Sequence, residues 1–139
     1  MDSISKAKKK EKIGDIEGAL VILKDALAHN PNDISTQIEI ANLYATNNYF
    51  LEAATYFRKL LPITNGNEDI KEGLCFCLEQ IGNAYQINRN YKLAKDYFEE
   101  VLTHNPNNPD YLFNYGNALL SLNQFDRSID AYQSSIKNN

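Results

Sequence analysis

The chain has 139 residues, a formal net charge of −4 and 43% hydrophobic residues, a size and balance that fit one folded domain. Its first twelve residues contain five lysines and two acidic residues, so the remainder carries a net charge of −7 and does not suit a nucleic acid partner. No stretch approaches membrane-spanning length and none has the apolar core of a signal peptide, so we expect a protein of the reducing cytoplasm with no membrane partner.

The chain repeats one pattern four times. Each copy is centred on a small residue with bulky residues three positions before it and four and eight positions after it, which places them on one face of a helix. A second small residue lies twelve positions upstream and marks a preceding helix. The central residues, spaced 34, 41 and 34 apart, are Ala19, Ala53, Ala94 and Ser128, and the upstream residues are Ala7, Ala41, Gly82 and Gly116. Such a period indicates a helical repeat protein.

In chain order we expect four helix pairs, over about residues 1–33, 34–67, 68–108 and 109–139. The first helix of the first pair is degenerate because it is rich in Ser and Lys, and the last pair is truncated at its end. The second helix of a pair should stop at Asn-Pro sequences, because proline does not continue a helix and asparagine tolerates a left-handed exit. These sequences are Asn30-Pro31 and Asn105-Pro106, and the turns within the pairs are predicted at Gly14, Asn48, Arg89 and Asn123.

The third unit is longer than its neighbours by seven residues. Seven is close to two helical turns, so a helix lengthened by this amount nearly keeps the phase of its apolar face. We therefore predict an extended first helix from about Glu68 to Ile87 and not a longer loop.

This arrangement resembles the tetratricopeptide repeat family, whose unit of about 34 residues is a helix–turn–helix. The best matches are Leu78, Ile81, Gly82, Tyr85, Tyr91, Ala94, Phe98 and Pro106 in the third unit, and Leu112, Gly116, Ala118, Phe125 and Tyr132 in the fourth. The chain departs from the family pattern in its first helix, in the longer third unit and at Asn65, where a proline is expected. The resemblance implies an all-α superhelix of about four repeats, forming a single domain over residues 1–139.

The lysine cluster of the first helix has two interpretations. A terminal repeat needs a polar outer face, so a lysine-rich first helix fits a cap. The alternative is a basic arm that contacts nucleic acid or a membrane. We favour the cap.

No residue cluster indicates a metal, cofactor or catalytic site. Cys75 and Cys77 would diverge by about 200° on a helix and cannot pair, so we expect structural thiols. His29 and His104 occupy the same column at a helix end, where two repeats do not converge on a shared metal ion. The chain lacks a phosphate-binding glycine loop and a nucleophile elbow, so we expect no enzyme activity, no cofactor and no metal.

The resemblance implies that the first helix of every unit lines a concave groove, where function is expected. Asparagine recurs in one groove column, and an amide offers both the donor and the acceptor that a peptide backbone needs. Groove asparagines commonly hold bound peptide in this family, although asparagine is equally interpreted as a frequent residue of this column. The predicted groove residues are Ile38, Asn42, Phe76, Glu79, Asn83, Asp110, Phe113 and Asn117.

The expected partner follows from the charges of the groove. One branch of the family clamps an acidic tail with cations, but Ile38, Gln80, Asp110 and Asn114 stand at those positions here. An acidic tail beside Glu79 and Asp110 would lack a counter-charge, so we expect a neutral or basic peptide with apolar side chains. An apolar stripe in the last helix also predicts self-association through that helix. The stripe consists of Phe125, Ile129, Tyr132 and Ile136.

Two functions fit these features. The first is a non-catalytic protein–protein interaction module, a scaffold or adaptor that holds a peptide or helix of a partner. The alternative is the docking or regulatory portion of a larger enzyme, such as a glycosyltransferase or sulfotransferase. The ending at Lys137-Asn138-Asn139, where a further proline and helix would follow, favours keeping this alternative.

Overall fold

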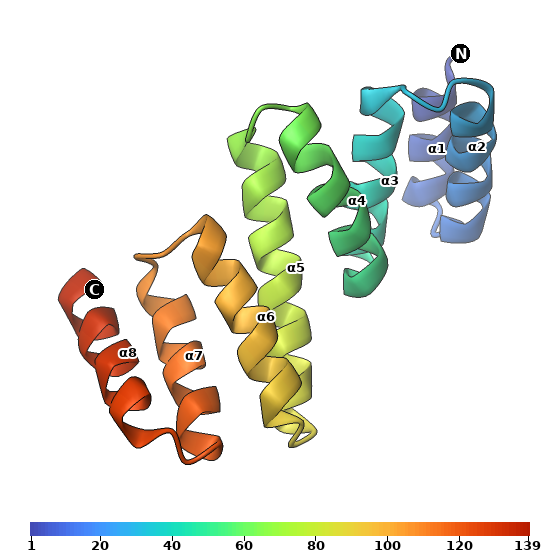
Figure 1. Ribbon diagram of the computed structural model, residues 1–139. Helices are drawn as coiled ribbons and strands as arrows, with labels where there is room; N and C mark the ends of the chain where they lie inside the picture. The colour runs from blue at the N-terminus through green and yellow to red at the C-terminus, as the bar shows by residue number, and fades with distance from the viewer. The chain divides into compact units, whose positions relative to one another are not determined.

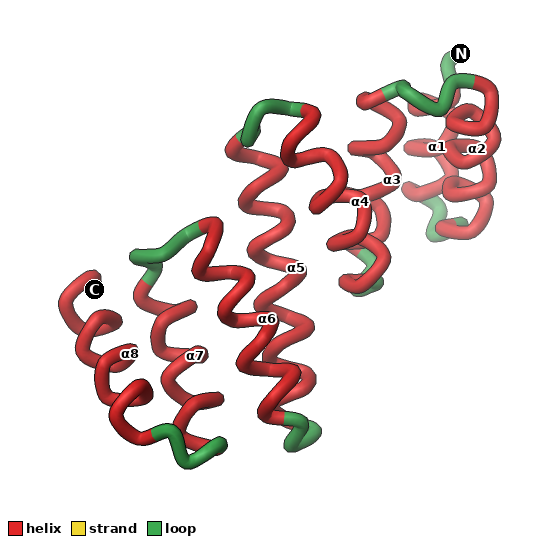
Figure 2. The backbone as a smooth tube through the Cα atoms, viewed as in Figure 1, coloured by secondary structure: helices red, strands yellow, loops and turns green.

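The computed structural model describes residues Met1–Asn139 and contains eight α-helices and no strand (Figures 1 and 2). The helices are α1 (Ser3–Lys12), α2 (Ile16–His29), α3 (Ile34–Thr46), α4 (Phe50–Ile63), α5 (Glu68–Ile87), α6 (Tyr91–His104), α7 (Pro109–Ser121) and α8 (Phe125–Asn138). The predicted all-α fold is confirmed. The extended helix is confirmed too, because α5 has 20 residues whereas the others have 10 to 14.

The chain forms two compact units, Met1–Gly73 and Leu74–Asn139, and the boundary between them falls inside α5. The first unit contains α1 to α4 and the beginning of α5. The second contains the rest of α5 with α6, α7 and α8. The division of residues 1–139 into four repeats of one domain stays a prediction, and the two units are described separately below.

The core of the first unit is built on the predicted small residues. Helix α1 packs on α2, α3 packs on α4, and α2 also packs on α3. Ala7 and Ala19 are buried in a cluster with Leu23, Ile40 and Leu43. Small side chains at these positions let the helices approach closely, and the larger aliphatic side chains fill the space between them.

The second unit uses glycine and alanine beneath aromatic rings in the same way. Helix α7 packs on both α6 and α8. Phe98 is buried with Ala94 and Ala118, and its ring lies against Gly82. The ring of Tyr132 lies against Gly116 in the same manner. The columns of small residues therefore mark places where a ring of one helix contacts the backbone of another.

All four predicted turns within the pairs have a left-handed backbone. The φ angles are 81° at Gly14, 66° at Asn48, 62° at Arg89 and 60° at Asn123. These values confirm the turn column, which the sequence fills with glycine, asparagine and one arginine.

The predicted left-handed exit at the Asn-Pro sequences is wrong. Helices α2 and α6 do end there, but φ is −138° at Asn30 and −142° at Asn105. A residue before proline is restricted to the extended region, and this restriction outweighs the tolerance of asparagine. After α4, where no proline follows, Asn65 and Gly66 do adopt the left-handed conformation, with φ of 55° and 72°.

Arg89 offers a test of backbone strain at the turn between α5 and α6. A residue with a Cβ pays about 1–2 kcal/mol in the left-handed region. Glycine avoids this cost but loses about 0.5–1 kcal/mol more through conformational entropy. We expect Arg89→Gly to raise the free energy of unfolding by about 0.5 kcal/mol in urea titrations, and Arg89→Val to lower it. A loss of stability in the glycine variant would contradict the strain at this turn.

Candidate peptide-binding surfaces

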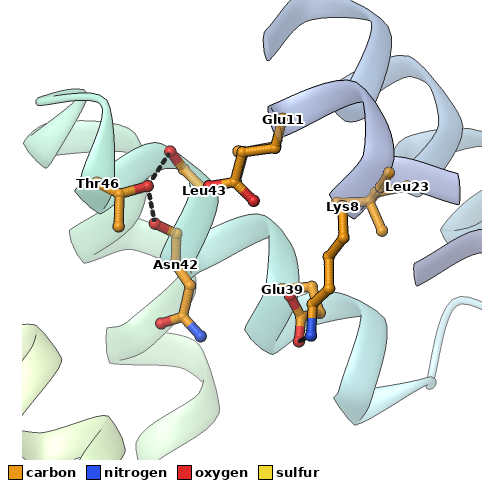
Figure 3. A pocket seen from close by; sticks show the side chains of 8 residues that line it. Lys8, Glu11, Leu23, Glu39, Asn42, Leu43 and Thr46 are labelled. Carbon is orange, nitrogen blue, oxygen red and sulfur yellow. Dashed lines mark hydrogen bonds and ion pairs between the residues drawn. The ribbon is translucent and has the colours of Figure 1, made fainter. Parts of the chain in front are cut away.

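The first unit has a small pocket between α1 and α3 (Figure 3). Ala7, Leu23 and Leu43 are buried side chains that form its apolar floor, and its volume is about 50 Å³. This is room for one or two methyl groups of a ligand side chain. Lys8, Glu11, Glu39, Asn42 and Thr46 are the polar residues that line it.

The rim of this pocket contains charged side chains and one amide that can hydrogen-bond to a ligand. The Nζ atom of Lys8 lies 3.3 Å from Oε1 of Glu39 and joins α1 to α3, as Figure 3 shows. Glu11 adds a second carboxylate from α1. The side chain of Asn42 is exposed and has no hydrogen-bond partner within the protein. Thr46 uses its hydroxyl internally, donating to the carbonyl oxygen of Asn42 at 3.0 Å.

Only Asn42 of this pocket was among the predicted groove residues. Ile38 is half-buried on α3 and does not line the pocket. Lys8 and Glu11 of α1 were not predicted because the first helix was interpreted as a cap, and Glu39 of α3 was not predicted either. A usable signal existed, since Glu39, Asn42 and Thr46 follow one another at helical spacings of three and four.

In the second unit the corresponding side chains of α5 and α7 are bonded to each other. Asn114 Nδ2 donates to Oε1 of Glu79 at 3.0 Å, and Gln86 Nε2 donates to the hydroxyl oxygen of Ser121 at 3.1 Å. Beside these bonds, the ring of Phe76 is 47% exposed on α5 and the ring of Phe113 is 52% exposed on α7. The second unit thus presents apolar rings next to a fixed polar network.

The two predicted groove asparagines of this unit differ chemically. The hydroxyl of Tyr132 donates to Oδ1 of Asn117, so this oxygen is already occupied inside the protein. Asn83 is half-buried and its side chain has no such partner. The Tyr132 ring also lies beside Phe113, with 5.7 Å between the ring centroids. Asn83 is therefore the better candidate to bind a ligand, and Asn117 also helps to hold α8 against α7.

The carboxylates of this surface repel each other. Burial raises the pKa of Glu79 above its usual value, the nearby charge of Asp110 raises it further, and the hydrogen bond from Asn114 opposes both effects. A cation placed here would relieve the repulsion, whereas an anion would add to it.

Comparison with known proteins shows a family match over part of the chain. Residues 80–139 match the family model described as tetratricopeptide repeat. Solved structures with a similar helical arrangement include MamA MSR-1, which is 14% identical with a TM-score of 0.63 over 98% of this chain and 74% of that chain. The family match covers 60 of the 139 residues, all of them in the second unit. The solved structure shows the same kind of helical fold.

Two further similarities extend over almost the whole chain. MamA 41-end from Desulfovibrio magneticus RS-1 is 22% identical with a TM-score of 0.58, over 99% of this chain and 73% of that chain. The general transcriptional corepressor trfA of Dictyostelium discoideum is 27% identical over 129 residues. This region is 91% of the present chain but only 9% of the corepressor, so the similarity concerns a short part of that protein.

The two cysteines lie in the core, and the two histidines lie at helix ends. Cys75 and Cys77 are both buried, and burial raises the pKa of the Cys77 thiol to about 11, which disfavours the reactive thiolate at neutral pH. His29 and His104 are the last residues of α2 and α6, as predicted. The chain contains no group of three His, Cys, Asp or Glu side chains arranged to hold a metal ion. None of its helices combines the length and apolar character needed to span a membrane.

The raised pKa of Glu79 predicts how stability depends on pH. Folding disfavours the charged carboxylate of Glu79. Its ionisation therefore lowers the free energy of unfolding at pH values above the folded pKa, and this loss is absent below the unfolded pKa of 4.5. Glu79→Gln should therefore raise the free energy of unfolding at pH 7 by about 0.5 kcal/mol, a modest figure because solvent screens this partly exposed group. Urea unfolding at pH 7 and pH 3.5 measures this, and an equal gain at both values would contradict it.

Proposed function

We propose that the chain is a non-catalytic adaptor. It holds a neutral or basic peptide that has apolar side chains, on the surfaces formed by the first helix of each helix pair. One observation carries the proposal. In each unit, exposed or cavity-lining apolar groups adjoin carboxylates and an asparagine whose amide has no partner inside the protein. Asn42 is this asparagine in the first unit and Asn83 in the second.

The chemistry of these surfaces favours the proposed partner. A free amide can pair with both the N–H and the C=O group of an extended peptide. Glu11 supplies an exposed carboxylate in the first unit, and the second unit supplies the half-buried carboxylate of Glu79 and the exposed one of Asp110. Lysine or arginine side chains of a partner would gain from these charges and acidic ones would lose. The similarity to part of a transcriptional corepressor is compatible with an adaptor role in a larger assembly.

Selection of a random peptide library on the chain tests the proposal. We expect the enriched peptides to combine lysine or arginine with aliphatic or aromatic residues. Their binding, measured by fluorescence anisotropy, should weaken when the basic residues are replaced by glutamate. Enrichment of acidic peptides, or peptides that bind equally after this replacement, would reject the proposed partner class.

We also propose that the chain self-associates through α8. Phe125, Ile129 and Ile136 are large apolar side chains that are mostly exposed on this helix. Contiguous apolar stripes of this kind favour contact with another protein surface. Concentration-dependent association of the purified chain is the expected result, and sedimentation velocity measures it.

A further inference from the structure

The exposed stripe of α8 has acidic neighbours. Phe125, Ile129 and Ile136 are exposed by 55%, 52% and 76%, and their spacings of four and seven place them on one face of the helix. Asp126 and Asp130 are exposed beside this face and have no ion-pair partner within the chain. We call these five residues the acidic face. It combines apolar area with two negative charges.

A surface of opposite charge lies on α1 in the first unit. Lys6, Lys9, Lys10 and Ile13 follow at spacings of three, one and three, which keeps them on one side of the helix. Together with Met1 and Ile22 of α2 they line a shallow groove of about 550 Å³, which we call the basic face. Ile13 is 76% exposed there.

The lysines of the basic face differ in whether they form an ion pair within the protein. Nζ of Lys10 lies 3.0 Å from Oδ2 of Asp15, whereas Lys6 and Lys9 have no ion-pair partner. Lys8 points to the other side of α1, where it pairs with Glu39 of α3. Two ammonium groups are thus available next to exposed apolar side chains, away from the pocket of Figure 3.

We propose that the basic face of one copy binds the acidic face of a second copy. This inference rests on the proposed self-association through α8 and names the surface that receives it. The aliphatic stems of Lys6 and Lys9 can cover the exposed apolar side chains of α8 while their ammonium groups reach Asp126 and Asp130.

Charge disfavours two symmetric arrangements. Pairing two acidic faces would bring Asp126 and Asp130 of both copies together, and pairing two basic faces would oppose their lysines. The contact is therefore heterologous, with different surfaces on the two partners, so that one copy of a pair keeps a free acidic face and the other keeps a free basic face.

The size of the faces sets the strength of the contact. A helix of 14 residues such as α8 is about 21 Å long, and neighbouring helices lie about 10 Å apart. A contact of these dimensions buries less than the roughly 1,600 Å² of a standard interface. We therefore expect association that is weak, that increases with concentration and that decreases with added salt.

Sedimentation velocity on the whole 139-residue chain, from about 10 μM to 1 mM, tests the inference with paired charge reversals. The variants Lys6→Glu/Lys9→Glu and Asp126→Lys/Asp130→Lys should each weaken self-association about tenfold or more, because attraction becomes repulsion. An equimolar mixture of the two variants should associate again, since opposite charges then meet. The control, Lys59→Glu/Lys92→Glu, makes the same change in net charge as Lys6→Glu/Lys9→Glu, but at exposed lysines outside both faces.

The possible failures are distinguishable. If the wild-type chain is monomeric throughout this range, both the self-association and the inference are wrong. If it associates but Lys6→Glu/Lys9→Glu has no effect, α8 binds a different surface and only the inference is wrong, leaving the basic face to an occupant such as anionic lipid. Melting curves of each variant confirm that it folds, and failure of the folded mixture to associate also overturns the inference.

Discussion

Replacing Gly82 by leucine should destabilise the protein by about 3 kcal/mol and lower its melting temperature by about 10 °C. A Cβ atom at this position would lie 2.6 Å from Cε1 of Phe98, closer than real contacts allow. The Phe98 ring is almost fully buried and belongs to the core of the second unit, so it cannot move into solvent. Leucine gains about 1 kcal/mol in helix propensity over glycine, but the overpacking exceeds this gain.

Ala84→Leu is the matched control because Ala84 is exposed on the same helix, two residues further along. It should change the free energy of unfolding by no more than about 0.5 kcal/mol. Circular dichroism melts of both variants test the assignment. If Gly82→Leu melts at or above the temperature of the wild type, then the ring of Phe98 does not pack on this glycine in solution.

The repeat pattern predicted the helices well because it follows directly from packing. Small residues such as Gly82 and Ala94 recur where rings and backbones meet, and turn residues such as Asn48 recur where φ is positive. The length of α5 was also predictable, since seven residues preserve the phase of a helix. The exit at Asn30 was predicted wrongly because the following proline restricts its backbone.

The candidate site was less predictable because side-chain pairing depends on contacts between helices. The sequence presents Asn42, Asn83 and Asn117 as equivalent, yet only Asn117 accepts a hydrogen bond from Tyr132, which lies 15 residues away. The pocket of the first unit depends on Lys8 meeting Glu39 across two helices, and spacing within either helix does not reveal this ion pair. Repeat columns predict which residues share a position but not which of them remain available to a ligand.

The double variant Asn42→Ala/Asn83→Ala should weaken peptide binding to each unit by about two- to tenfold without lowering the melting temperature. Both amides lack partners inside the protein, so their removal leaves the folded state intact. In a complex each amide can contribute roughly 0.5–1.5 kcal/mol through hydrogen bonds, and more where a peptide group is left unsatisfied. Such a loss corresponds to a factor of about two to ten in the Kd for peptide bound to the unit concerned. Anisotropy titrations with the library-selected peptides and parallel melting curves measure the two effects.

Asn117→Ala distinguishes an effect on peptide binding from an effect on stability. The amide oxygen of Asn117 accepts a hydrogen bond from the hydroxyl of Tyr132, and this variant removes it. This variant should lower the free energy of unfolding by about 1 kcal/mol whether or not a peptide contacts it. The matched control, Asn32→Ala/Asn107→Ala, removes two exposed asparagines from turns and should leave binding unchanged. If Asn42→Ala/Asn83→Ala binds the selected peptides as tightly as the wild type, the asparagines are only common residues of this repeat column. The peptide must then be held elsewhere, since the two amides proposed to bind it would contribute nothing.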